Sequence, residues 1–138
     1  MRLVLDTNVL ISAFVSRGLC SELLEHCARH HELITSDALI EELRGKLLGK
    51  FRLSVPATDQ ALAALLAGME IVRPATLPAR VSRDADDDVV IARAAGGACE
   101  AIITGDRDLL DLKSYGGILM LAPREFWLNE TQPSPDPP

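Results

Sequence analysis

The amino-acid sequence predicts an α/β fold in which helices cover both faces of a mostly parallel sheet. Short apolar runs of three or four residues recur along the chain, segments with helical periodicity separate them, and the runs do not alternate apolar with polar residues. Uninterrupted apolar strands are typical of a parallel sheet buried on both faces, because side chains on either face meet a helix. The chain of 138 residues has the length of one domain.

In the first half of the chain, caps and periodicity define the elements. A strand over residues 3–5 is closed by Asp6, and we expect Asn8 to cap the helix behind it. A second helix over residues 20–31 leads to a strand over residues 33–35. Ser36 or Asp37 then caps a third helix, whose apolar residues follow the 3.6-residue period: Leu39, Ile40, Leu43, Leu47 and Leu48.

In the middle of the chain, Gly49 and Pro56 bound a linker, and we expect Thr58 to cap an alanine- and leucine-rich helix that ends at Met69. A strand over residues 70–73 is stopped by Pro74, and a loop follows. An acidic cluster then opens a helix over residues 89–95, which ends at two glycines.

The last part of the chain contains the clearest strand, over residues 101–104. Gly105 allows a tight turn into a short helix with Leu109, Leu110 and Leu112, and a last strand covers residues 118–121. We assign residues 1–128 to a single domain and residues 129–138, which end in a proline-rich stretch, to a disordered tail.

Composition excludes several classes of protein. No apolar run approaches the roughly 18 residues of a membrane span, and we expect a cytoplasmic protein. Cys20, Cys27 and Cys99 are odd in number and lack C-x-x-C spacing, which argues against a disulfide framework and a structural zinc site. His26, Cys27 and His30 could share a helix face and bind a metal, but such residues on a polar helix surface are usually only solvated.

The negative charge is concentrated rather than spread. The net charge is −6, yet eight of the 20 acidic residues fall in four places, and the other 12 face 14 basic residues, of which 11 are arginine. Those eight are Asp6, Glu42, Asp84, Asp86, Asp87, Asp88, Asp106 and Asp108. Because aromatic residues are only 4% of the chain, base stacking is an improbable mode of RNA binding, and we expect contacts to phosphate through arginine.

Two of these acids directly follow strands. Asp6 follows the strand over residues 3–5, and Asp106 follows the strand over residues 101–104 after one glycine. In doubly wound sheets the functional crevice lies at the carboxyl ends of the strands, where the strand order reverses. If these two strands are neighbours, Asp6 and Asp106 meet there, and the acids near the starts of two helices can join them.

Carboxylates held close together repel one another unless a cation neutralises them, so a divalent ion is implied. Oxygen ligands without paired histidines or cysteines favour Mg²⁺ or Mn²⁺, which keep water and accept substrate phosphate. One ion, or two ions roughly 3.5–4 Å apart, would activate water for phosphodiester hydrolysis. The sequence has no Ser/His/Asp order, G-x-S-x-G elbow or glycine-rich phosphate loop that would indicate another chemistry.

The identity of two ligands stays open at this point. Glu41 and Glu42 both lie at the border of the apolar helix face, and periodicity does not choose between them. Asp84, Asp87 and Asp88 have i, i+3 and i+4 spacing, and acids at a helix start are also stabilised by the helix dipole. We expect one or two of these three to be ligands.

Four motifs together resemble the PIN domain (PilT N-terminus), over about residues 1–125. They are LDTNVLIS at residues 5–12, SDALIEEL at 36–43, DADDD at 84–88 and ITGDRDLL at 103–110. The spacing is most similar to bacterial toxins of toxin-antitoxin pairs, of the VapC type. The resemblance implies a three-layer α/β/α sandwich with a mostly parallel five-stranded sheet, a Mg²⁺- or Mn²⁺-dependent endoribonuclease activity, an antitoxin partner and a homodimer.

Residue by residue, the resemblance implies four catalytic metal ligands: Asp6, Glu42, Asp87 and Asp106. It also implies residues that flank or orient them, namely Thr7, Asn8, Ser36, Asp84, Asp88, Thr104 and Asp108. The sequence has Ala85 where close relatives often have proline, so the register within the acidic cluster is open. The apolar helices near residues 21–28 and 61–69 could supply a dimer interface.

Two other classes of function fit parts of this pattern. A receiver domain that accepts a phosphoryl group has a similar length, sheet and acidic Mg²⁺ pocket, but the strand over residues 70–73 offers no aspartate to accept it. A non-catalytic module with the same fold would act by binding a partner, and the complete set of acids disfavours it.

Overall fold

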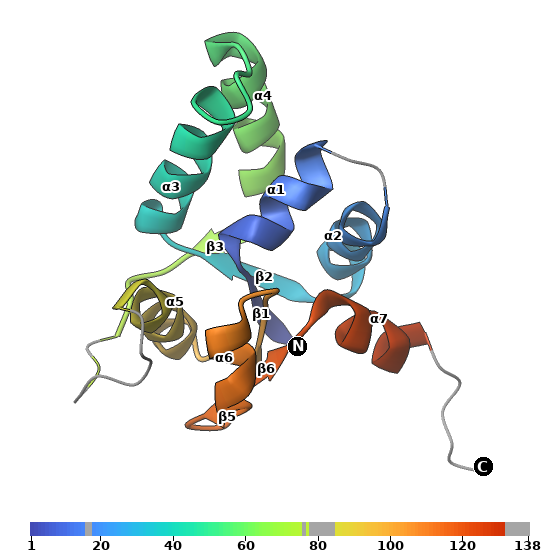
Figure 1. Ribbon diagram of the computed structural model, residues 1–138, viewed down its shortest axis with the longest axis vertical. Coiled ribbons are helices and arrows are strands. Elements are labelled where there is room, and N and C mark those ends of the chain that lie inside the picture. The colour runs from blue at the N-terminus through green and yellow to red at the C-terminus, as the bar shows by residue number, and fades with distance from the viewer. Residues whose placement is uncertain (16–17, 76, 78–84, 132–138) are drawn as a thin grey trace.

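The computed structural model describes residues 1–15, 18–75, 77 and 85–131, with the side chains of residues 85–87, 89 and 131 outside that description (Figure 1). The described strands are β1 (Arg2–Leu5), β2 (Glu32–Thr35), β3 (Met69–Ile71), β4 (Ala101–Ile103), β5 (Ser114–Tyr115) and β6 (Ile118–Leu121). The described helices are α1 (Thr7–Val15), α2 (Leu19–His30), α3 (Asp37–Leu48), α4 (Val55–Leu66), α5 (Ala85–Gly96), α6 (Arg107–Leu112) and α7 (Pro123–Thr131).

The strands form one sheet in the order β3-β2-β1-β4-β6-β5, which has six strands where the sequence predicted five. The first five in that order run parallel, as predicted. The additional strand, β5, pairs antiparallel with β6 across a tight turn in which Gly116 and Gly117 take positive φ of 55° and 85°. Glycine adopts this left-handed region without strain, so the chain reverses within two residues.

Helices cover both faces of the sheet and complete the three layers (Figure 1). Side chains alternate along β1, so Leu3 and Leu5 face one cluster while Val4 faces the other. The first cluster includes Leu10, Leu23, Leu43, Leu62 and Phe126 from α1, α2, α3, α4 and α7. The second includes Ile91 and Leu109 from α5 and α6. The predicted α/β class is therefore confirmed, with strands that are apolar on both faces.

Two predicted caps are wrong. The helix α1 begins at Thr7, directly after β1, because the main-chain carbonyl of Asp6 accepts from the N–H groups of Val9 and Leu10 at 3.0 and 3.1 Å. Asn8 therefore lies inside the first turn and is exposed. In α4 the cap is Ser54, whose Oγ accepts from the N–H of Ala57 at 3.2 Å.

Thr58 lies within α4, where its own N–H donates to the carbonyl of Ser54 at 2.9 Å. Pro56 is tolerated in the first turn of this helix, since an N–H there would have no partner inside the helix. By contrast, the prediction of a cap at Ser36 is confirmed, because its Oγ accepts from the N–H of Leu39. At the other end of the chain, α7 continues to Thr131, past the predicted domain boundary at residue 128.

The end of α5 packs against the sheet through two glycines. A Cβ on Gly96 would lie 2.0 Å from the carbonyl oxygen of Arg73, and a Cβ on Gly97 would lie 2.6 Å from Cγ2 of Ile34. Only glycine fits at these positions, so the sequence pair fixes how closely α5 approaches β2 and the segment after β3. Within the described part of the chain, no helix is long and apolar enough to span a membrane.

Candidate functional site

The central strands β1 and β4 end side by side and deliver polar residues to one edge of the sheet. Leu5 of β1 is in register with Ile103 of β4, as the prediction of neighbouring strands requires. Asp6 follows β1 and Thr104 follows β4, and the main-chain N–H of Asp6 donates to the carbonyl of Ile103 at 2.9 Å. The strand order changes direction here, since β1 leads to β2 on one side and β4 leads to β6 on the other.

Asp6 is buried, with 8% of its surface exposed, and both of its carboxylate oxygens accept hydrogen bonds. The main-chain N–H of Thr7 donates to Oδ1 and the hydroxyl of Thr104 donates to Oδ2, each at 2.8 Å. Burial raises the pKa of Asp6 above its ordinary value, and these two hydrogen bonds oppose the rise. The negative charges of Glu42 and Asp106 raise the pKa of Asp6 further.

Asp106 caps the short helix α6, because its Oδ1 accepts from the main-chain N–H of Asp108 at 2.8 Å. The N–H of Asp106 itself donates to Oγ1 of Thr104 at 3.0 Å. Thr104 therefore connects the two acids, accepting from the backbone of Asp106 while donating to Asp6.

Glu42 lies on α3 and its charge acts on both Asp6 and Arg93. Its side chain is half exposed and its Oε1 lies 3.3 Å from Nζ of Lys46, one helical turn later. Periodicity did not choose between Glu41 and Glu42. Of the two, Glu42 is the one whose negative charge raises the pKa of Asp6.

Arg93 is the residue at this edge that the sequence analysis missed. It lies in α5, only 1% of its surface is exposed, and its Nε donates to Oγ of Ser36 at 2.6 Å. Its terminal NH1 nitrogen has no hydrogen-bond partner among the residues that the structure describes. Burial lowers the pKa of Arg93, and the charges of Asp6 and Glu42 oppose that. The sequence signal that could have identified Arg93 is its position inside the apolar stretch VVIARAA.

The remaining predicted residues differ in their burial and in how much of them the structure describes. Ser36 is buried at the end of β2, whereas Asn8 is exposed on α1. Asp88 and Asp108 are half-buried, near the starts of α5 and α6. Asp84 lies outside the described residues, and for Asp87 only the backbone, in the first turn of α5, is described.

Residues 2–108 of the chain match the family model of the PIN domain. The chain belongs to the PIN domain family. The crystal structure of VapBC2 from Rickettsia felis bound to a DNA fragment from their promoter contains a chain with the same fold, at a TM-score of 0.61 and 14% sequence identity. That similarity covers 88% of this chain and 98% of the other. No curated protein matches the chain in sequence.

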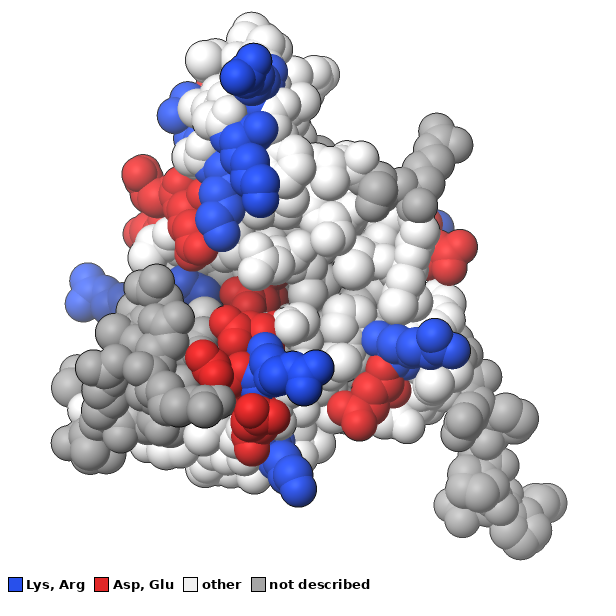
Figure 2. All heavy atoms as spheres, in the orientation of Figure 1, with Lys and Arg blue, Asp and Glu red and all other residues white. Residues whose placement is uncertain are grey.

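On the surface of this PIN domain, acidic side chains gather near the centre of the face shown in Figure 2, over α6 and toward the start of α3. Basic side chains line α3 beside them. Within the described residues, Asp6, Glu42 and Asp106 do not bring their carboxylate oxygens within 4.8 Å of one another as a group of three. The PIN domain thus presents one buried carboxylate, Asp6, on which the charges of Glu42 and Asp106 act and whose own charge acts on the buried Arg93.

Proposed function

We propose that this PIN domain is a metal-dependent endoribonuclease that hydrolyses RNA phosphodiesters and acts in the cytoplasm. In this proposal Asp6, Glu42, Asp87 and Asp106 are the catalytic residues and hold Mg²⁺ or Mn²⁺. The single observation that supports it most is the setting of Asp6, a buried carboxylate fixed on both oxygens whose pKa is raised by burial and by two neighbouring acids.

The donor set fits a hard divalent cation. Every proposed ligand offers carboxylate oxygen, which Mg²⁺ and Mn²⁺ prefer. Glu42 and Asp106 both disfavour the ionised form of Asp6, and a cation at this position would reverse that effect. When bound, the cation would stabilise negative charge on the phosphate and hold a water molecule that ionises more readily than bulk water.

The protein's own groups would hold the reacting parts in place. Thr7 and Thr104 orient the carboxylate of Asp6 through the hydrogen bonds described above. Ser36 holds Arg93 in the same way. Asn8, Asp84, Asp88 and Asp108 flank the ligands in this proposal. Basic residues on α3, including Arg44 and Lys46, would contact the RNA backbone, which suits a site with few aromatic side chains.

Water would attack the phosphorus of the phosphodiester and the P–O3′ bond would break, which leaves products with a 5′-phosphate and a 3′-hydroxyl. The test is cleavage of a structured RNA with Mg²⁺ or Mn²⁺, against EDTA. Asp6→Asn and Glu42→Gln are expected to lose at least a hundredfold in rate, about 2.7 kcal/mol of transition-state stabilisation. Glu41→Gln, on the same helix and also exposed, is the matched control and should retain activity.

Full metal-dependent cleavage by Asp6→Asn would contradict the role assigned to that residue. A protein that binds the ion but cuts no RNA would instead indicate a non-catalytic binding module. The strand β3 consists of Met69, Glu70 and Ile71, so it carries no aspartate that could accept a phosphoryl group, as a receiver domain would need.

We further propose that the protein is the toxin of a toxin-antitoxin pair. The similarity of its fold to a chain of VapBC2 supports this role. Expression of the wild-type chain is expected to arrest bacterial growth, while Asp6→Asn, produced to the same level, should not. Co-expression of an antitoxin from the neighbouring gene should restore growth, and arrest by both forms would count against the proposal.

We also propose a homodimer, formed through a groove between α1, α2 and α4. The groove is about 310 Å³ in volume and is lined mainly by apolar side chains, among them Phe14, Leu24, Ala28 and Leu65. A second copy would remove these side chains from water. Ala64→Arg, inside the groove, is expected to yield monomers in sedimentation equilibrium, whereas Ala63→Arg, exposed on the same helix, should remain dimeric. A monomeric wild type would contradict this proposal.

A further inference from the structure

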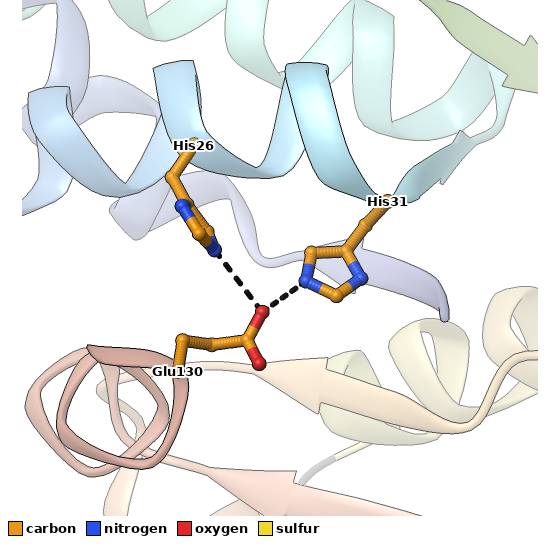
Figure 3. Close-up of side chains that lie close together, drawn as sticks. All are labelled: His26, His31 and Glu130. Atoms are coloured by element: carbon orange, nitrogen blue, oxygen red, sulfur yellow. Dashed lines mark hydrogen bonds and ion pairs between the residues drawn. The ribbon is translucent and has the colours of Figure 1, made fainter. Parts of the chain in front are cut away.

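Two histidines and a glutamate from distant parts of the chain converge at the opposite end of the sheet (Figure 3). Nε2 of His26 lies 3.1 Å from Oε1 of Glu130, and Nε2 of His31 contacts the same oxygen. One potential ligand atom from each of the three residues lies within 4.8 Å of the other two. All three side chains are mostly buried, with exposed fractions of 23%, 10% and 24%.

The end of α2 explains why these histidines pair. Helical spacing would place His26 beside His30, and their rings do lie 4.7 Å apart. The helix stops at His30, however, and His31 takes an extended conformation with φ of −136°. That change of backbone direction turns His31 toward α7, where Glu130 lies.

Aromatic side chains from α7 hold both imidazole rings in place. The edge of Trp127 meets the ring of His26 at 5.6 Å between centroids, and Phe126 meets the ring of His31 at the same distance. Phe126 is buried in the main core cluster, so the packing that fixes α7 also fixes the ligand geometry. Little further ordering of these side chains is needed for them to bind an ion.

We propose that His26, His31 and Glu130 form a zinc site that joins α2 to α7. Zinc sites commonly combine two histidines, one carboxylate and an open fourth position. Ligand distances of about 2.0–2.1 Å to a tetrahedral ion put ligand atoms about 3.3 Å apart, close to the 3.1 Å between Nε2 of His26 and Oε1 of Glu130. The site accepts Zn²⁺ or a related transition ion in preference to Mg²⁺, because imidazole nitrogen suits the former and Mg²⁺ demands oxygen.

The charge on Glu130 suits this role. Burial works to raise the pKa of Glu130, but the hydrogen bonds and charges of His31 and His26 outweigh it and leave that pKa below its ordinary value.

A hollow beside His31 gives an ion access to this residue. His31 lines a hollow of about 570 Å³ together with Met1, Arg29 and His30. Its Nδ1 lies 3.1 Å from the α-amino nitrogen of Met1.

The zinc site is independent of the proposed nuclease site. His31 immediately precedes β2, at the amino end of the parallel strands, whereas Asp6 and Asp106 follow β1 and β4 at their carboxyl ends. Failure of either proposal leaves the other standing.

The test is calorimetric titration of the untagged, metal-free protein with Zn²⁺ alone, together with thermal melting. One ion per chain is expected, with a rise of roughly 5–10 °C in melting temperature at a hundredfold excess over Kd. His26→Gln, His31→Gln and Glu130→Gln should each weaken binding at least tenfold. His30→Gln, an exposed histidine of the same helix, is the matched control and should bind as the wild type does.

Asp6→Asn distinguishes the two proposed metal sites, because it should retain full Zn²⁺ binding while its melting temperature should no longer rise with Mg²⁺. Metal-free melting temperatures of the variants show whether each still folds, and because His26 is more exposed than His31, His26→Gln is the safer of the two histidine variants. No uptake of Zn²⁺ by the wild type, or binding that survives His26→Gln and disappears in Asp6→Asn, would overturn the proposal.

Discussion

The hydroxyl of Thr104 donates a hydrogen bond of 2.8 Å to Oδ2 of Asp6 across 98 positions of sequence. The same oxygen of Thr104 accepts from the main-chain N–H of Asp106 at 3.0 Å, so one buried side chain ties the ends of β1 and β4 to the start of α6. The position of Asp6 relative to Asp106 thus depends on a residue that carries no charge.

Replacing Thr104 by valine, which has nearly the same shape, removes both hydrogen bonds. We expect Thr104→Val to lose about 1–3 kcal/mol of stability, since it leaves the buried N–H of Asp106 and one oxygen of Asp6 without a partner. Thr104→Ser keeps the hydroxyl and should lose less. Urea denaturation of both variants measures the difference, and equal losses would show that the hydroxyl contributes nothing.

Metal binding at the acids should stabilise the fold. Because a cation offsets the repulsion around Asp6, saturating Mg²⁺ is expected to raise the melting temperature of the wild type by roughly 5 °C or more, and that of Asp6→Asn hardly at all. Differential scanning fluorimetry over a Mg²⁺ series checks this. Equal shifts in the two proteins would place the binding elsewhere.

The raised pKa of Asp6 makes a prediction about the metal-free protein. Burial favours the neutral form of Asp6 in the fold. The stability that this protonated carboxyl contributes is fully present below the pKa of Asp6 in the unfolded chain, near 3.8, and is lost as pH rises through the higher pKa of Asp6 in the folded protein. In EDTA, the stability of Asp6→Asn should therefore rise relative to that of the wild type as pH rises from 4 to 8. Melting temperatures across that range test it, and a constant difference would contradict the assigned pKa direction.

The contact between Arg93 and Ser36 should be measurable as a coupling. A hydrogen bond from a buried guanidinium is worth about 1.5–3 kcal/mol, so Arg93→Met and Ser36→Ala should each destabilise the protein, and their effects should not add. The double-mutant cycle by chemical denaturation is expected to give a coupling of that size. Additive losses would mean that the two side chains act independently.

The glycine at the end of α5 should tolerate no side chain. Gly96→Ala places a Cβ against the carbonyl oxygen of Arg73 and is expected to lose more than 2 kcal/mol, as overpacking against backbone does. Gly45→Ala, in the exposed middle of α3 with nothing within 4 Å, should instead gain up to about 1 kcal/mol. Thermal melting of the pair separates a steric requirement from general helix propensity.

Much of the fold follows from the sequence because its signals are local. The uninterrupted apolar runs identify the parallel strands, and Ser36 caps its helix as its residue type predicts. The caps predicted at Asn8 and Thr58 were wrong because other groups, the carbonyl of Asp6 and the side chain of Ser54, satisfied the helix ends earlier in the chain. The hairpin of β5 and β6 depends on only two residue pairs, which leave little periodicity to detect.

The sequence by itself determined that Asp6 and Asp106 lie at one edge of the sheet, because each follows an apolar strand and the two strands are parallel neighbours. It also determined the PIN family, through four motifs in order. Only the tertiary structure decided that the charge of Asp6 acts on a buried Arg93 and that His26 and His31 share one oxygen of Glu130. Those contacts form where a helix ends and where separate helices pack together, so the spacing of residues within one helix or strand does not predict them.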